Sequence, residues 1–216
     1  MKSYSHVDCN NIYLDKLLDM LFEEKTDGFY IELGANDGLF QSNTAYFEFH
    51  RNWKGILIEP SLLGYKRCKK NRQNSIVLNK ACVSNKYKEK YVYGDFKDNH
   101  AMASINGERL NRKAQVRVEA STLESILDTH LNNNSIDFLS LDTEGYEYNI
   151  LEGLNFDKYR PKYMLIEIYL KDYIKKYNFL DKNNYKLMSN FTNYNKKTNP
   201  GWDGKHNDYL FIDKSS

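Results

Sequence analysis

The chain has 216 residues, a length that favours a single domain. Its 31 Lys and Arg residues nearly balance its 29 Asp and Glu residues, and the net charge of +2 argues against a binder of duplex nucleic acid. No apolar run approaches the roughly 20 residues of a membrane helix, and the first residues lack the apolar core of a signal peptide. We therefore expect one soluble, cytoplasmic domain over residues 1–216, with residues 1–27 as a helical lead-in, no nucleic-acid partner and no membrane span.

The three cysteines carry no sign of a metal site. Cys9, Cys68 and Cys82 form no CxxC pair and no other metal-binding spacing. An odd number of cysteines without a pattern is typical of a reducing compartment.

The first part of the chain alternates predicted helices with apolar strands. Residues 12–25 carry four leucines at helical spacing and predict an amphipathic helix. Three buried strands and two further helices follow. The strands are expected over 29–33, 54–60 and 75–83, and the helices begin near residue 42 and after Ser61, whose hydroxyl can cap the helix.

The second part continues the alternation after a polar, weakly patterned stretch at 84–114. Short strands are expected at 91–93 and 116–118, a helix opens on the capping box at 121–124, and a strand covers 136–142. A helix with Ile150, Leu151 and Leu154 on one face, a strand at 163–168 and two closing strands near 185–188 and 209–212 complete the chain. The closing strands are joined without a clear helix, which predicts that they pair antiparallel.

This alternation predicts an α/β fold built as a three-layer sandwich. Right-handed crossovers give a mostly parallel, seven-stranded sheet with an antiparallel last strand. Ligands of such open sheets bind at the carboxyl ends of the strands. That rule selects residues 32–38, Glu59, residues 81–84, residues 142–145 and Glu167 as one site.

Two features of this site indicate an adenosine-containing ligand. Gly34 and Gly38 stand where the first strand turns into a helix, and glycine there lets a ligand approach the backbone closely. Glu59 ends the second strand, where a carboxylate can accept both hydroxyls of a ribose. A dinucleotide and S-adenosylmethionine (SAM) both fit these features.

Charge favours SAM over a dinucleotide. Glu32 and Asp37 bracket the glycine loop, and Asp142 and Glu144 close the neighbouring strand end. Carboxylates oppose a pyrophosphate but suit a ligand that carries an ammonium and a sulfonium group. The loop also lacks the third glycine of the dinucleotide motif.

Methyl transfer to a hydroxyl requires a positioned oxygen and removal of its proton. Asp142 is expected to point toward the transferred methyl group. The candidates for proton removal by placement are Asp142, Glu144, Glu167, His206 and Asp208. If a metal takes part, Asp142, Glu144 and Glu167 supply hard oxygen ligands for Mg²⁺.

The motifs resemble the FkbM family of SAM-dependent methyltransferases. The resemblance rests on residues 31–38, 42–44 and 53–60, then 122–127 and 136–145, with 208–211 similar to the final strand, and it covers roughly residues 28–212. It implies a class I, Rossmann-like fold and O-methylation of sugar, glycan or natural-product hydroxyls.

The resemblance also implies roles for individual residues. Glu32, Gly34, Ala35, Asn36 and Asp37, with Gly38, cradle the methionine part of SAM. Asn43 reaches the SAM carboxylate, Glu59 binds the ribose, Ala81 and Cys82 line the adenine, and Asp142 also faces the cofactor.

Other interpretations remain open at this point. The chain could be a nicotinamide-dependent oxidoreductase, or a module that binds SAM or a glycan without turnover. Glu144 could cap a helix, Glu167 could pair with a lysine, and His206 could be a surface histidine without a role. The acceptor and the oligomeric state cannot be read from the sequence, and loops 84–114 and 190–207 are expected to cover the acceptor.

Overall fold

A seven-stranded sheet forms the centre of the molecule. The computed structural model describes residues 1–98, 100–107, 109–132 and 135–215. The strands of the main sheet are β1 (Phe29–Leu33), β2 (Lys54–Ile58), β3 (Ile76–Leu78), β7 (Phe138–Leu141), β8 (Tyr163–Tyr169), β9 (Tyr185–Asn190) and β10 (His206–Asp213). They lie in the order β3-β2-β1-β7-β8-β10-β9. The neighbouring strands β3, β2, β1, β7 and β8 pair in parallel, whereas β10 is antiparallel to both β8 and β9. The predicted α/β class and the antiparallel last strand are confirmed.

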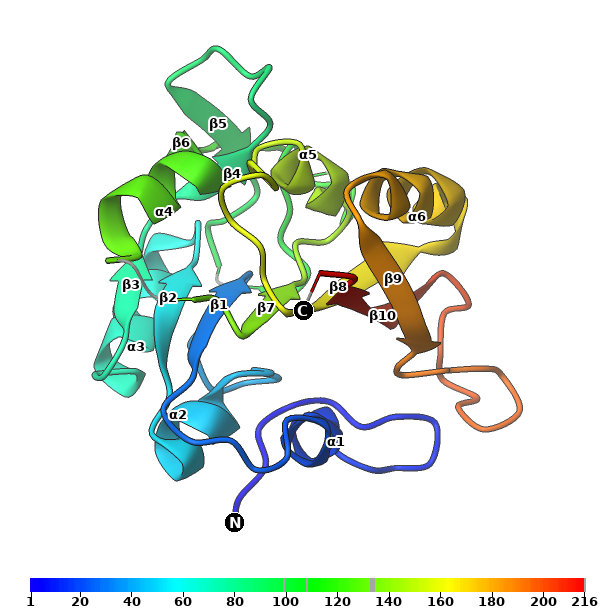
Figure 1. Cartoon of the computed structure of the whole chain (residues 1–216). Helices are drawn as coiled ribbons and strands as arrows, with labels where there is room; N and C mark the ends of the chain where they lie inside the picture. Colours follow the sequence, from blue (N-terminus) through cyan, green and yellow to red (C-terminus); the bar gives the residue numbers. More distant parts are fainter. Residues whose placement is uncertain (99, 108, 133–134, 216) are drawn as a thin grey trace.

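Helices cover both faces of this sheet (Figure 1). They are α1 (Leu14–Leu21), α2 (Ala45–Arg51), α3 (Leu62–Asn71), α4 (Leu123–His130), α5 (Glu147–Leu151) and α6 (Tyr173–Lys182), and a short 3-10 helix spans Leu170–Asp172. Side chains alternate along each strand, so Ile31 packs with the α4, α5 and α6 layer while Tyr30 packs with the α1, α2 and α3 layer. The result is the three-layer sandwich expected from the sequence.

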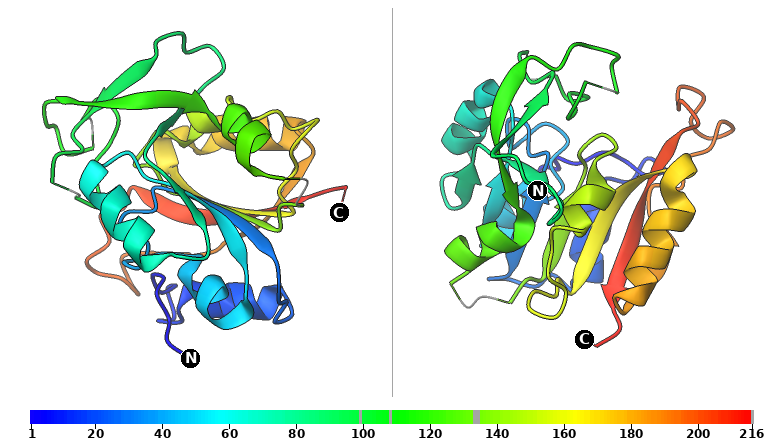
Figure 2. Two further views of the ribbon diagram at one scale, coloured as in Figure 1. Left: turned by 90° about the vertical axis from the view of Figure 1, so that its left-hand side faces the viewer. Right: turned by 90° about the horizontal axis from the view of Figure 1, so that it is seen from above.

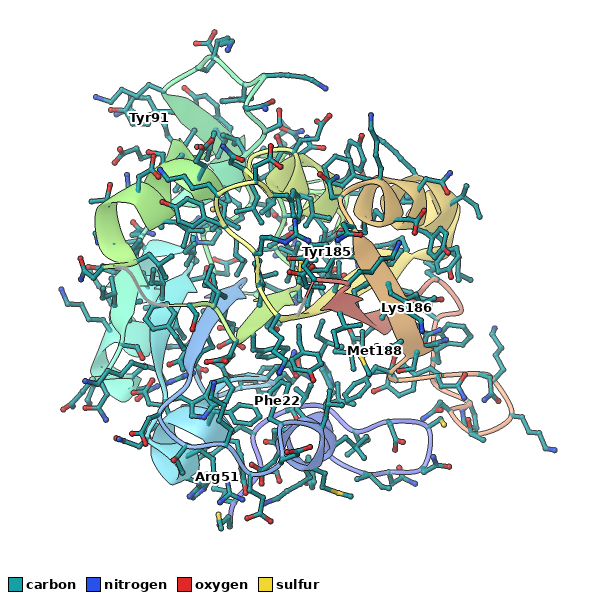
Figure 3. The ribbon with its side chains drawn as sticks, viewed as in Figure 1. Phe22, Arg51, Tyr91, Tyr185, Lys186 and Met188 are labelled. Carbon is teal, nitrogen blue, oxygen red and sulfur yellow. The ribbon has the colours of Figure 1, made fainter. Side chains whose placement is uncertain are left out.

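Residues 1–27 pack against the sheet through an aromatic cluster. Phe22 lies 5.5 Å from the ring of Trp53 and 5.4 Å from that of Phe138, measured between centroids. Figure 3 shows Phe22 between α1 and the sheet. Leu14 and Leu18 of α1 are fully buried beside this cluster, which explains the leucine spacing.

The single strand expected over 75–83 is wrong, because the chain leaves the main sheet after β3. The side-chain amide of Asn79 donates to the carbonyls of Glu59 and Pro60, each at 2.9 Å, and anchors the turn. β4 (Ala81–Val83) then pairs with β6 (Val116–Thr122), which also pairs with β5 (Tyr91–Gly94). This three-stranded sheet stands apart from the main one, on the side of α4 and α5 (Figures 1 and 2).

Two helices differ from the sequence analysis. α5 ends at Leu151, so Leu154 is buried outside the helix. α6 was not predicted, since its fully buried positions are only Leu180 and the charged Lys176. No helix in the described part of the chain is long and apolar enough to cross a membrane.

Candidate active site

A cavity of about 410 Å³, called the first cavity here, opens at the carboxyl ends of β1, β2, β7 and β8. The predicted site residues that line it are Gly34, Asn36, Glu59, Ala81, Cys82, Asp142, Glu144, Glu167 and His206. Residues 100–105 cover it from the connection between β5 and β6, and His6 joins from the N-terminal segment. The strand-end rule therefore brings residues from distant parts of the sequence into one place.

Glu59 is held rigidly at the end of β2. Its two carboxylate oxygens accept the backbone N–H groups of Asn36 and Ser61, both at 2.7 Å. Burial raises the pKa of Glu59 to about 7, although these two hydrogen bonds oppose the shift. The carboxylate therefore ties the glycine loop to β2 while it faces the cavity.

Gly34 lets two strand ends meet. Its φ angle is +79°, and a Cβ atom there would lie 1.8 Å from the carbonyl oxygen of Asp142. No side chain fits in that space, so the glycine is required for the approach of the β1 and β7 ends. This packing role accounts for the residue type and also leaves the loop backbone beside the cavity.

Glu32 faces away from the first cavity. It has the same strand parity as Tyr30, so its carboxylate points toward the α2 and α3 layer, where it accepts hydrogen bonds from the Ser42 hydroxyl at 2.9 Å and the Thr44 hydroxyl at 2.6 Å. The fully buried Arg72 lies 3.5 Å away and also pairs with Glu48 at 2.8 Å. Glu32 thus organises the segment between the glycine loop and α2 and does not line the cavity.

Four other residues assigned to the cofactor also lie outside the cavity lining. Ala35 is buried in the α1, α2 and α3 layer, and Gly38 packs against Arg72 and Cys68. Asp37 accepts the backbone N–H groups of Leu39 and Phe40 at 2.9 and 2.8 Å. The amide nitrogen of Asn43 donates to the Ser140 hydroxyl at 3.0 Å. The structure gives these residues a role in shaping the loop, and their contact with cofactor stays a prediction.

Three carboxyl groups gather at the ends of β7, β8 and β10. Asp208 pairs with Glu167 in the register of β10 and β8, and Asp142 and Glu167 lie close enough for each to shift the pKa of the other. Burial, followed by the neighbouring carboxylates, raises the pKa values of Asp142 and Glu167 well above normal. Burial also raises the pKa of Asp208 to about 7. Burial and the mutual repulsion of carboxylates therefore favour the protonated forms of these groups more strongly than water does.

His206 is the first residue of β10 and belongs to this cluster. Its Nε2 atom lies 3.4 Å from Oε1 of Glu167, and its Nδ1 atom lies 3.6 Å from Asp203. Burial lowers the pKa of His206, which keeps the imidazole neutral at physiological pH. A neutral imidazole surrounded by carboxyl groups is suited to accept a proton, because the resulting cation is stabilised by its neighbours.

Glu144, in the lining of the first cavity, accepts hydrogen bonds from two side chains. Its Oε2 atom accepts hydrogen bonds from Nε of Arg109 at 2.9 Å and from the hydroxyl of Tyr169 at 2.8 Å. The Arg109 guanidinium also lies 5.5 Å from the Tyr169 ring centroid. Glu144 therefore fixes the position of Arg109 at the cavity wall.

A buried ion pair holds the loop after β7. Lys176 of α6 contacts Glu147 at 2.5 Å, and both side chains are almost completely buried. The other oxygen of Glu147 accepts the backbone N–H groups of Thr143 and Gly145 at 3.0 and 2.9 Å. The loop that carries Asp142 and Glu144 is thus fixed by a residue of the unpredicted helix.

The carboxyl groups do not fit the expected magnesium site. Over the described residues, no group of three or more His, Cys, Asp or Glu side chains is arranged to hold a metal ion. One of the three expected ligands, Glu144, already pairs with Arg109. The Mg²⁺ expectation therefore lacks support, and we derive no step through a metal.

Sequence reasoning missed Arg109, Tyr169, Lys176 and His6. Arg109 lies in the weakly patterned stretch and His6 in the lead-in, where periodicity gives no placement. Lys176 had a detectable signal, since it lies one turn before Leu180 on the buried face of a short amphipathic segment.

The sequence comparison identifies the family. The methyltransferase FkbM domain matches residues 32–192. The chain belongs to the FkbM methyltransferase family. This membership makes it a SAM-dependent methyltransferase and disfavours the dinucleotide oxidoreductase. No curated protein matches the sequence closely enough to count as a relative.

Solved structures agree with the fold. A precorrin-6y C5,15-methyltransferase from Geobacter metallireducens is 9% identical with a TM-score of 0.50, and the match covers 92% of this chain and 87% of that chain. Fibrillarin from Aeropyrum pernix, solved with natively bound S-adenosyl-L-methionine, is 11% identical with a TM-score of 0.50 over 91% of this chain and 74% of that chain. These similarities show a shared fold.

Proposed function

We propose that this protein is an O-methyltransferase that transfers the methyl group of SAM to a hydroxyl of a sugar, a glycan or a related natural product. The observation that carries the proposal is the position of the His206–Glu167 pair. It lies at the wall of an acid-rich cavity, at the strand ends where this fold binds ligands.

The lining of the first cavity fits SAM. Its volume of about 410 Å³ lies in the range of small-molecule sites. Glu59 is placed to accept the ribose hydroxyls, and Ile58, Ala81 and Cys82 offer an apolar wall for the adenine. Asp142 places a carboxyl group in the lining, beside the end of β1. When bound, SAM supplies an electrophilic methyl group next to a positive sulfonium.

His206 is the proposed base. Its neutral imidazole accepts the hydroxyl proton at Nε2 while the acceptor oxygen attacks the methyl group. Glu167 stabilises the imidazolium that forms, because its Oε1 atom lies 3.4 Å from Nε2, and Asp208 follows two residues later on β10, in register with Glu167. Removal of the proton during the attack is worth about 10²–10⁴-fold in rate.

Asp142 and the loop after β7 position the reacting groups. The Glu147–Lys176 pair and the Gly34 contact fix this loop from both sides. Holding an oxygen in line with the methyl group can supply ~7–11 kcal/mol of the barrier reduction.

Calorimetry with S-adenosylhomocysteine (SAH), followed by transfer of labelled methyl from SAM to a panel of sugars and glycans, tests the proposal. We expect SAH to bind and the label to appear as a base-stable methyl ether. Failure to bind millimolar SAH contradicts the cofactor assignment. Tight SAH binding without transfer to any hydroxyl compound favours a non-catalytic module, and transfer only to nitrogen or carbon acceptors contradicts O-methylation.

A further inference from the structure

A second cavity adjoins the first. Its volume is about 700 Å³. Its lining comes from four places: Ile105, Asn106 and Arg109; the loop at 144–146 with Asn149 of α5; the end of β8 with the 3-10 helix; and residues 204–205 before β10. The backbone N–H of Leu170 donates to the carbonyl of Lys205 at 2.8 Å, which brings Lys171 and Lys205 to one rim.

The two cavities share a wall. Ile105, Arg109 and Glu144 line both of them. A molecule in the second cavity therefore borders directly on the first, within reach of the strand ends that hold the methyl donor. No other role has been assigned to the second cavity.

The linings differ in charge. Among the described residues, the second cavity has three basic side chains, Arg109, Lys171 and Lys205, against one carboxylate, Glu144. The first cavity has four carboxylates, Glu59, Asp142, Glu144 and Glu167, against two basic side chains, Lys80 and Arg109. Since Arg109 already neutralises Glu144, the two lysines leave the second cavity positive. A positive lining attracts an anion and opposes a cation.

The remaining lining suits a sugar ring. Tyr146 and Tyr169 offer aromatic surfaces, and Asn106 and Asn149 offer amide donors and acceptors. The hydroxyl of Tyr169 is fixed by Glu144 at 2.8 Å, so its ring is held in place. Aromatic and amide groups beside a lysine rim match a polar ring that bears a negative substituent.

We propose that the second cavity binds the acceptor, and that the acceptor is a sugar carrying an anionic group, either a phosphate or a carboxylate, which Lys171 and Lys205 recognise. The inference rests on the proposed function, because it places the acceptor hydroxyl beside the SAM site. Lys171 and Lys205 act in binding, whereas His206 acts on the hydroxyl proton.

Binding to the SAH-loaded protein tests this assignment. The probes are glucose 1-phosphate, glucuronate, neutral glucose and cationic glucosamine, titrated by calorimetry at low salt. We expect at least one anionic sugar to bind about tenfold or more tightly than glucose, and glucosamine to bind no better than glucose. Preference for glucose 1-phosphate alone identifies a phosphate group, and preference for glucuronate alone identifies a carboxylate.

A pair of double variants locates the binding. Lys171→Ala with Lys205→Ala removes the rim, and Lys182→Ala with Lys186→Ala removes two exposed lysines outside both cavities; Figure 3 shows Lys186 on β9. We expect the first variant to lose about tenfold in affinity for the anionic sugar with unchanged SAH affinity, and the second to retain both affinities.

Several outcomes overturn the inference. One is equal or undetectable binding of the anionic and neutral sugars up to about 10 mM. Another is an anion preference that survives in the Lys171 and Lys205 variant or is lost equally in the control. Failure of the proposed function is distinguishable, because it appears first as absent SAH binding to the wild-type protein. The sugar titrations are then repeated on the unloaded protein, where equal binding of all four sugars overturns the second cavity as well.

Discussion

The first and second cavities share three wall residues but differ in the sign of their charge. The first gathers Glu59, Asp142 and Glu167 at the strand ends, while the second carries Lys171 and Lys205 on its rim. Arg109 and Glu144, which line both cavities, form an ion pair at 2.9 Å between the acidic lining of the first cavity and the basic rim of the second. A cationic methyl donor and an anionic acceptor would each find a complementary surface, and neither would fit the other's place.

The two cavities also differ in the kind of backbone that forms their walls. The first cavity is built on strand ends whose carboxylates have backbone partners or paired neighbours. The second is built mainly on connections between elements. Binding of a common cofactor needs a fixed frame, whereas acceptor specificity can vary in loops.

The largest effect is expected at the boundary of the first cavity. His206→Ala removes the proposed base, so kcat for methyl transfer should fall about 10²–10⁴-fold while SAH affinity is retained. Labelled methyl transfer and calorimetry measure the two quantities. His130→Ala, at the end of α4 and outside both cavities, is the matched control and should leave both unchanged. Near-normal turnover of His206→Ala would remove the imidazole from the mechanism.

The next effect concerns the loop that forms the wall between the cavities. Lys176→Met leaves the buried Glu147 without its cationic partner and should lower the free energy of unfolding by about 3–5 kcal/mol. Lys175→Met changes the neighbouring, exposed lysine and should cost less than about 1 kcal/mol. Urea unfolding of both variants makes the comparison. Similar losses in the two would show that the ion pair does not secure the loop.

A smaller effect is expected for the cofactor side alone. Glu59→Ala removes a carboxylate placed for the ribose and should weaken SAH binding about 10–100-fold. Glu152→Ala removes a carboxylate that pairs with Lys86 outside both cavities, so it should have little effect on SAH binding. Circular dichroism checks that the loop tied to Glu59 remains folded. Unchanged SAH affinity in a folded Glu59→Ala protein would assign the ribose to another residue.

The central frame of the molecule was predictable from local pattern. Apolar runs at 29–33, 54–58 and 163–168 match buried strands, and parallel strands end at one edge of the sheet. That rule alone places Glu59, Asp142 and Glu167 together. The rule does not decide which face of the strand a residue occupies, and Glu32 lies on the opposite face, in contact with Thr44 and Arg72.

The second cavity was not predictable, because its residues meet through long-range packing. Arg109 comes from a polar stretch without periodicity, and it reaches Glu144 across 35 positions of sequence. α6 is a short amphipathic segment, but its buried position Lys176 is charged, and the sequence does not show that this side chain pairs with Glu147. Charged pairs of this kind depend on the fold and cannot be read from spacing.

The smallest expected effect follows from pH and distinguishes the cavities once more. The pKa values of Glu59 and Asp208 are raised to about 7 by burial, and those of Asp142 and Glu167 are raised above normal by burial and by neighbouring carboxylates. Their contribution to stability is therefore fully present below the ordinary carboxyl pKa near 4 and is lost as the pH rises through about 7. The melting temperature of the ligand-free protein should fall between pH 5 and pH 8.

Over the same pH range the first cavity gains negative charge. Because SAM carries a sulfonium that SAH lacks, the preference for SAM over SAH should increase about fivefold, or ~1 kcal/mol, between pH 6 and pH 8. Calorimetry with both ligands measures this ratio. Glu59→Gln removes the lining carboxyl group whose pKa is about 7 and should flatten the dependence, whereas the Lys171→Ala, Lys205→Ala variant should retain it. A ratio that is independent of pH in the wild-type protein would mean that the first cavity does not sense the charge of its ligand.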